Sequence, residues 1–165
     1  MTTYNLIETA TVGSGGAASI VFSSIPATYT DLKIVASLRN TSTGSQTLLS
    51  FNGSTASFTG KYLLGVGSGT PSSGSLARYT GPMSLASFTA NVFGNSEIYI
   101  PNYLSSSYKS FSADTVTENN STTAYMALTA GLWSVASAIT SVTLTPDNFN
   151  FAEFSSASLY GISNS

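Results

Sequence analysis

The stretch Asp31-Leu-Lys-Ile-Val-Ala-Ser-Leu-Arg39 sets the fold class of this chain. Its apolar and polar residues alternate, with Leu32, Ile34, Ala36 and Leu38 on one side and Lys33, Ser37 and Arg39 on the other. Successive side chains of a β-strand point to opposite faces of a sheet. The stretch therefore predicts a strand with one face in a hydrophobic core and one face toward solvent.

The same alternation recurs along the chain, and no helical periodicity of useful length appears. Ile98 and Ile100, Met126 and Leu128, and Val142 and Leu144 are further apolar positions expected to face a core. Gly- and Asn-rich turns separate the runs. Strands are predicted near residues 4–11, 18–24, 31–39, 46–52, 61–64, 76–80, 84–92, 96–100, 108–118, 124–132, 138–145 and 156–162. Short strands at this spacing favour an all-β antiparallel sandwich or barrel. With no linker in view, residues 1–165 are expected to form a single domain, with 65–75 as one flexible surface loop.

The composition is unusual in its lack of charge. Charged residues make up 7% of the 165 positions, against about 25% in an average soluble protein. Ser and Thr fill their place, with 31 and 22 copies. A chain so poor in charge should tend to associate, so we expect it to work as an oligomer or within a larger shell.

Several function classes are disfavoured by the same counts. A net charge of −2 with five basic residues cannot neutralise a phosphate backbone, so no nucleic-acid partner is expected. The chain has no Cys and no His, which removes thiolate nucleophiles and the commonest metal ligand and general base. Residues 1–8 lack the basic region of a signal peptide. Ser, Thr and Gly interrupt the uncharged stretch between Glu118 and Asp147, so no membrane span is expected.

Three sequence features deserve a chemical test, and each has a plainer explanation. Ser106-Ser-Tyr-Lys109 fits the Ser-x-x-Lys nucleophile motif, but a chain this rich in Ser produces it by chance. Gly65-Val-Gly-Ser-Gly69 lacks the helix that a phosphate loop requires. Asp147, Asn148 and Asn150 match only a fragment of a calcium loop and indicate a turn. We therefore predict no enzyme, no catalytic residue, no cofactor and no metal site.

The aromatic residues divide into core and surface candidates. Phenylalanines and the tryptophan are the core candidates, and the core is expected to take most of Phe22, Phe51, Phe58, Phe111, Phe149, Phe151, Phe154 and Trp133. Tyrosines are candidates for surface contacts, because Tyr with Ser, Gly and Asn builds adaptable binding surfaces. The candidates for such contacts are Tyr62, Tyr79, Tyr99, Tyr103 and Tyr108.

Several ordered segments together resemble a family of bacteriophage virion structural proteins from phages of aquatic bacteria. The segments are Phe22-Ser-Ser-Ile-Pro-Ala-Thr-Tyr-Thr-Asp-Leu-Lys-Ile34, Phe51-Asn-Gly53, Tyr62-Leu-Leu-Gly65, Ile98-Tyr-Ile-Pro-Asn-Tyr103, Tyr108-Lys-Ser110, Gly131-Leu-Trp133, Ala138-Ile-Thr-Ser-Val-Thr-Leu144 and Phe154-Ser-Ser-Ala-Ser-Leu-Tyr-Gly-Ile162. The chain departs from the family at Ser54, where relatives often carry Asp, and at Lys61 or Tyr62, where a His is often seen. Any ion held by that polar cluster in relatives is in doubt here.

The resemblance implies a jelly-roll-like β-sandwich without catalysis, displayed on a virion surface after synthesis in the host bacterial cytoplasm. It favours a capsid decoration protein that bridges subunits of the major capsid protein, working as a homotrimer. The alternative is a tail or head-fibre adhesin whose loops 65–75 and 102–107 contact a host surface glycan. A glycan-cleaving enzyme stays open as a third hypothesis, because two of the seven carboxylates could form a pair.

Overall fold

The computed structural model describes residues 2–67 and 69–164, and twelve β-strands run through them. The strands are β1 (Thr2–Thr11), β2 (Ile20–Phe22), β3 (Asp31–Leu38), β4 (Gln46–Phe51), β5 (Phe58–Val66), β6 (Ser72–Ser75), β7 (Tyr79–Pro82), β8 (Gly94–Ile100), β9 (Lys109–Glu118), β10 (Ala124–Trp133), β11 (Val142–Pro146) and β12 (Ser156–Asn164). No helical segment in the described ranges could span a membrane.

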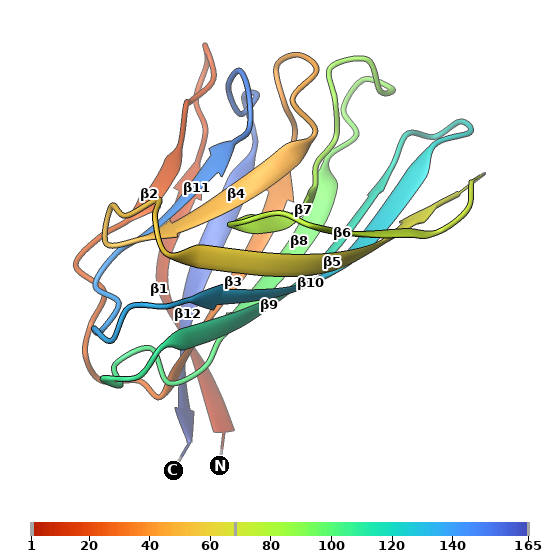
Figure 1. Cartoon of the computed structure of the whole chain (residues 1–165). Helices are drawn as coiled ribbons and strands as arrows, with labels where there is room; N and C mark the ends of the chain where they lie inside the picture. The colour runs from red at the N-terminus through yellow and green to blue at the C-terminus, as the bar shows by residue number, and fades with distance from the viewer. Residues whose placement is uncertain (1, 68, 165) are drawn as a thin grey trace.

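Two antiparallel sheets pack face to face (Figure 1). The larger has eight strands in the order β1-β12-β3-β8-β9-β10-β5-β6, and the smaller has four in the order β2-β11-β4-β7. The chain passes between the sheets repeatedly, since β1, β3, β5, β8 and β12 belong to the larger sheet and β2, β4, β7 and β11 to the smaller. This confirms the predicted all-β antiparallel sandwich, with the jelly-roll-like habit of alternating between layers.

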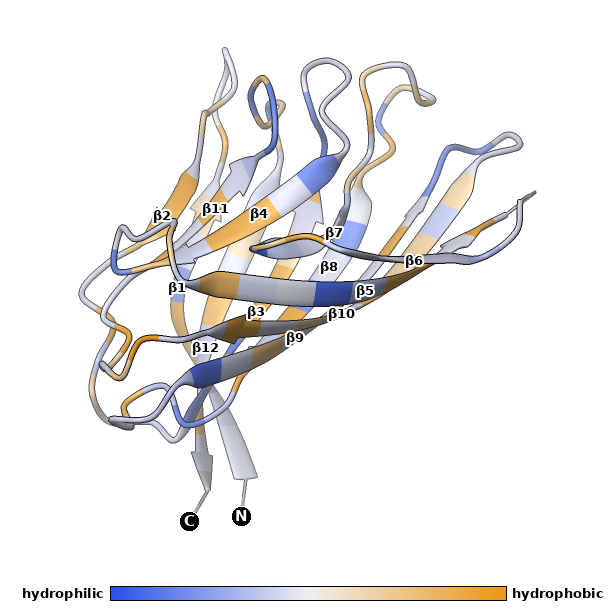
Figure 2. Ribbon diagram, viewed as in Figure 1, coloured by the Kyte–Doolittle hydropathy of each residue, from blue (hydrophilic) through white to orange (hydrophobic). Residues whose placement is uncertain are grey.

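The core lies between the two sheets and follows the alternation of the strands. On β3, Leu32, Ile34, Ala36 and Leu38 are all at most 4% exposed, as their spacing predicts. Most of the ribbon is pale or apolar in colour, and strongly hydrophilic positions are scattered along it (Figure 2). Burial of these apolar faces is the main stabilising contribution, at roughly 25 cal/mol per Å².

An aromatic cluster fills one part of this core. The ring of Phe51 on β4 lies 5.5 Å from those of Phe58 and Trp133 and 6.1 Å from that of Phe111, measured between centroids. The contacts with Phe111 and Trp133 are edge-on, which is a favoured arrangement for aromatic pairs. Because Phe51 belongs to the smaller sheet and the other three rings to the larger, the cluster joins the two layers.

Two parts of the predicted strand pattern are wrong. The segment 84–92 is a loop rather than a strand, and β6 lies inside the stretch 65–75 that was expected to be a loop. A side chain distant in sequence explains the first error. The Arg39 guanidinium donates four hydrogen bonds of 2.7 to 3.1 Å to the carbonyl oxygens of Ala86, Phe88, Thr89 and Val92. These bonds satisfy main-chain acceptors that a strand would have paired within a sheet.

On β10 the alternation is present but its phase is the reverse of the expected one. Met126 and Leu128 are 60% and 59% exposed, whereas Ala127 and Thr129 are buried. Trp133 shares the face of Ala127 and is 2% exposed. Burial of this one large ring fixes which face of β10 meets the core, because side chains two residues apart share a face. Met126 and Leu128, on the other face of β10, are thereby placed on the outside.

Candidate functional site

Four exposed aliphatic side chains form a continuous patch on the outer face of the eight-stranded sheet. This aliphatic patch consists of Leu63 on β5, Val116 on β9, and Met126 and Leu128 on β10, each 44% to 62% exposed. The strand register places Leu63 opposite Leu128 and Val116 opposite Met126. Single apolar residues are ordinary on a protein surface, whereas a contiguous group marks a candidate interaction site.

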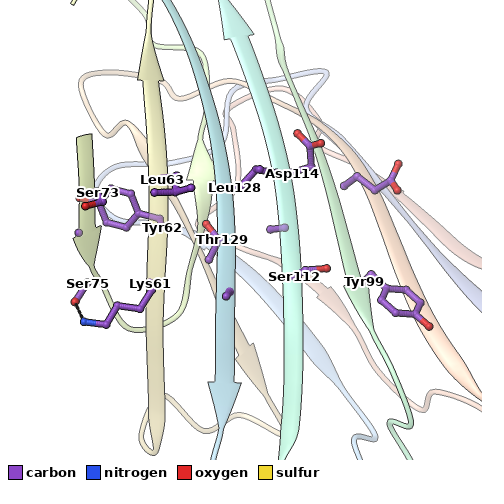
Figure 3. Close-up of a pocket in the computed structure, with 14 residues that line it drawn as sticks. Lys61, Tyr62, Leu63, Ser73, Ser75, Tyr99, Ser112, Asp114, Leu128 and Thr129 are labelled. Carbon is purple, nitrogen blue, oxygen red and sulfur yellow. Dashed lines mark hydrogen bonds between the residues drawn. The ribbon is translucent and has the colours of Figure 1, made fainter. Parts of the chain in front are cut away.

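The aliphatic patch lines a concave groove. Two adjoining hollows of about 600 and 640 Å³ share the lining residues Leu63, Ser73, Asp114 and Leu128. We call the two hollows together the groove. Figure 3 shows the lining side chains of the first hollow projecting from neighbouring strands. A concave, mainly apolar surface with a few polar groups has the general character of a ligand-binding site.

Two carboxylates lie side by side at this groove. Glu97 on β8 and Asp114 on β9 are partners in the sheet register, and both line the first hollow. An ion pair of 2.6 Å joins Oε1 of Glu97 to Nζ of Lys33. Within residues 2–67 and 69–164, the Asp114 carboxylate has no ion-pair or hydrogen-bond partner. The groove therefore holds one carboxylate already beside a cation and one free to accept hydrogen bonds.

This pair also bears on the glycan-cleaving alternative. Side chains that are direct cross-strand partners have Cβ atoms about 4.5–5.5 Å apart, so the register brings two carboxylates near each other, which is one of the requirements of a glycosidase. The ion pair with Lys33 occupies one side of the Glu97 carboxylate. The arrangement thus fits binding of hydroxyl groups better than bond cleavage.

Tyr99 is fixed at one end of the groove. Its hydroxyl donates a 2.8 Å hydrogen bond to Oδ2 of Asp31, and the main-chain N–H of Asn102 donates one of 2.8 Å to Oδ1. The hydrogen bond to Asp31, together with burial, raises the pKa of Tyr99 to about 12. The phenol consequently stays protonated at physiological pH and its ring has one orientation.

Lys61 supplies the positive charge at the opposite side of the first hollow. Its Nζ donates a hydrogen bond to Oγ of Ser75 on β6, which Figure 3 shows as a dashed line. The ammonium group is thereby held across the pairing of β5 with β6. Donors and acceptors accordingly flank the aliphatic patch on both sides.

The five tyrosines predicted as surface contacts are not brought together. Tyr62 and Tyr99 line the first hollow, and Tyr108 is 61% exposed in a loop outside it. The prediction of a surface position is wrong for Tyr79 and Tyr103, which are 4% and 0% exposed. The ring of Tyr79 packs 4.9 Å from that of Tyr62, and the hydroxyl of Tyr103 donates to the carbonyl of Pro26. A partner inside the protein for each ring explains the burial.

In the Ser-x-x-Lys segment, Ser106 to Lys109, the lysine holds the main chain of the preceding loop. Lys109 is 1% exposed, and its ammonium group donates hydrogen bonds to the carbonyl oxygens of Ser105, at 2.6 Å, and Ser107. Burial lowers the pKa of Lys109. The lysine therefore closes the loop 102–107 through main-chain acceptors rather than activating the Ser106 hydroxyl.

The segment from Asp147 to Asn150, which matches a fragment of a calcium loop and was predicted to be a turn, is held by hydrogen bonds to a carboxylate. Oδ1 of Asp147 accepts hydrogen bonds from the main-chain N–H groups of Asn148, at 3.0 Å, and Gln46, at 3.3 Å. The described residues contain no group of three or more Asp, Glu, His or Cys side chains close enough to hold an ion.

Two phenylalanines expected in the core are exposed instead. Phe149 and Phe154 are 60% and 69% exposed, with φ angles of 62° and 69°. A left-handed backbone is unusual for a bulky residue. The tight turns between β11 and β12 bury Phe151 at 0% exposure, and these turns leave the two other rings outside.

Sequence reasoning missed most of the groove residues, among them Leu63, Asp114 and Leu128 at its centre. The outward orientation of Leu128 could have been inferred from Trp133, because the size of the tryptophan ring indicates which face of β10 is buried. The juxtaposition of Asp114 with Glu97 depends on the register of β9 against β8, which no local pattern in the sequence gives.

No family model, curated protein or solved structure matches the chain. The functional proposal below consequently depends on the groove, on the edges of the sheets and on the ordered segments quoted above.

Proposed function

We propose that this protein is a non-enzymatic structural component of a bacteriophage particle, and that it decorates the capsid by bridging capsid subunits. The ordered segments resemble such a family, and the β-sandwich agrees with the architecture that the resemblance implies. Fold alone does not define function. The observation that carries the proposal is the long, unguarded edge strand β1.

Strand β1 lies at the edge of the eight-stranded sheet and pairs only with β12. Nearly all of it is exposed, including Tyr4 and Leu6 at 58% each. Glu8 is its single charged residue, and one bulge interrupts its register between Leu6 and Glu8. Natural proteins usually guard an exposed edge with charges, prolines, short length or a covering segment. A ten-residue strand with so few of these guards is suited to contact with a neighbouring subunit.

The contact we propose for β1 is a neighbouring copy in a homotrimer, which in turn sits on the capsid. A closed ring covers the β1 edge of each copy with a different surface of the next copy, so no β1 edge stays open. Because the contact is made by main-chain groups, hydroxyls and apolar side chains, it should depend little on salt. Many identical weak contacts with the shell then add without any chemical step.

The location of the protein on the particle tests the proposed function directly. Gold-labelled antibody on intact virions should mark the head, and quantitative mass spectrometry should count hundreds of copies per particle, because a bridging protein covers repeated capsid sites. Label confined to the tail, with a few to a few tens of copies, contradicts decoration.

Substitution of two exposed side chains of β1 tests the trimer. We expect the double variant Tyr4→Ser, Leu6→Ser to sediment as a monomer at concentrations where the wild type is a trimer. Burying each side chain contributes about 1.5–3 kcal/mol, and this is lost at every interface of the ring. Sedimentation velocity measures the change.

The matched control for this pair is Tyr108→Ser, which removes an equally exposed aromatic ring in a loop. This variant should remain trimeric, and thermal unfolding should show that both variants keep the fold. A monomeric wild type, or an equal loss of trimer in the Tyr108 variant, would reject the role of β1.

A second candidate function is that of a tail or head-fibre adhesin that binds a host surface glycan. The groove favours it, since polar groups flank an apolar floor there. Tail labelling in the location experiment would promote this function over decoration.

A further inference from the structure

The groove is long enough for a chain-like ligand. Its first hollow extends over β8, β9, β10, β5 and β6, and its second continues along β9, β10 and β5 toward Pro71, Val116 and Met126. The two share their central residues, so the surface between them is continuous. Successive residues on one face of a strand are about 6.6 Å apart, and the groove spans several such rows.

The floor of the groove offers no main-chain groups to a peptide. Strand β9 pairs with β8 and β10, and β10 pairs with β9 and β5, so the hydrogen-bonding edges of both strands are occupied. A peptide that binds by strand addition requires a free sheet edge, and the free edge beside the groove is that of the four-residue strand β6 at its side, not its floor. An isologous pair of copies joined through the groove is also disfavoured, because it would set one concave surface against another.

The side chains of the groove match an amphipathic ligand that is rich in hydroxyls. Leu63 and Leu128 are direct cross-strand partners at its centre and present an apolar floor. Asp114 lies opposite Leu128 on the next strand, and its carboxylate has no hydrogen-bond or ion-pair partner in the part of the chain that the structure describes. Lys61 and the Ser112 hydroxyl lie close by in the same hollow. A sugar ring has an apolar C–H face and a rim of hydroxyls that both donate and accept hydrogen bonds.

The charges select among sugars. The lining of the first hollow contains two carboxylates, Glu97 and Asp114, and one cation, Lys61. Lys33 offsets Glu97, so two lining charges have no ion-pair partner among the described residues: Lys61 at one side of the first hollow and Asp114 at the centre of the groove. A like charge on a uronic or sialic acid would be repelled there, and the apolar floor would weaken the screening. Neutral sugars avoid this repulsion and can donate hydroxyl hydrogen bonds to Asp114.

We propose that the groove binds a short neutral oligosaccharide, with its C–H faces on Leu63 and Leu128 and its hydroxyls bonded to Asp114. This adds a ligand site to the protein and holds whether the particle carries the protein on its head or its tail. It also places sugar contact on the sheet face instead of the loop 102–107.

Titration of the full chain with a defined panel tests the proposal. The probes are maltohexaose, cellohexaose, laminarihexaose, mannohexaose and hexa-N-acetylchitohexaose, with hexagalacturonate as the acidic counterpart. We expect at least one neutral hexasaccharide to bind at millimolar concentration, with amide chemical-shift changes centred on residues 63, 114 and 128. Hexagalacturonate should bind more weakly than that sugar.

Two substitutions and a control make the test specific. Asp114→Asn preserves shape and should weaken binding about tenfold, since hydrogen bonds to charged acceptors are the stronger ones. Leu128→Arg fills the floor and should abolish binding. Leu6→Ser lies on β1 outside the groove and should bind like the wild type, although it weakens the trimer.

The proposal is overturned if none of the five neutral probes binds, if the acidic probe binds best, or if the shifts map to the loop 102–107. Sugar affinity that survives both groove substitutions overturns it as well. The Leu6 variant tests the trimer and the Asp114 variant tests sugar binding. A failure of the proposed trimer can therefore be distinguished from a failure of the proposed sugar site.

Discussion

Replacement of Phe51 by alanine should lower the free energy of unfolding by about 4 kcal/mol, in the upper range for a core substitution. Phe51 is 0% exposed, and its ring touches aromatic rings of the opposite sheet. The variant leaves a cavity between the two layers, and the rigid rings around it cannot close it fully. Since domains are stable by only about 5–15 kcal/mol, the variant should be marginally folded. Chemical denaturation measures the loss.

The matched control is Phe149→Ala, which removes the same ring from a position 60% exposed. Its unfolding free energy should change by no more than about 0.5 kcal/mol, as at most surface sites. Equal effects of the two substitutions would mean that the aromatic cluster does not join the sheets.

Alkaline pH should destabilise the protein through Tyr79. Burial, and secondarily the nearby Tyr62, raises the pKa of Tyr79 from 10.0 to about 12. The folded state therefore holds this proton more tightly than the unfolded state does. The resulting stabilisation is complete below pH 10 and is lost as the pH rises toward 12. A difference of two pKa units corresponds to about 3 kcal/mol.

The variant Tyr79→Phe isolates this contribution. The Tyr79 hydroxyl has no hydrogen-bond partner among the described residues, so the variant should be as stable as the wild type at pH 8. Unfolding free energies at pH 8 and pH 11.5 should then show a smaller alkaline loss for the variant. Identical pH profiles would assign the loss to other groups, such as Tyr99, which both proteins retain.

Much of the architecture was predictable because it depends on local patterns. The alternation in β3 and the buried positions of β8 and β11 follow from their spacing, and the all-β sandwich follows from them. The loop 84–92 was not predictable, because the carbonyls of this segment are satisfied by Arg39, about fifty residues away. A local pattern shows that a segment can be extended, and only its partners determine whether it joins a sheet.

Of the candidate site, the sequence predicted some of the side chains but not how the fold brings them together. Tyr62 and Tyr99 line the groove, whereas Tyr79 and Tyr103 are buried inside the protein. Leu128 was placed on the wrong face, because an alternating run gives the period and not the phase. Asp114 meets Glu97 through strand register, and a slip by one residue would turn Asp114 into the core.

The pairing of β1 with β12 has a consequence for the protein's synthesis. Thr9 bonds to Ser158, 149 residues later. At about 5–20 residues per second that separation takes roughly 7–30 s to synthesise. Throughout this interval the nascent β1 has no partner of its own, and several chains growing on one messenger lie close together. A neighbouring chain that has already completed its β12 can pair with this strand first, so strand exchange between chains competes with the pairing of β1 and β12 within one chain.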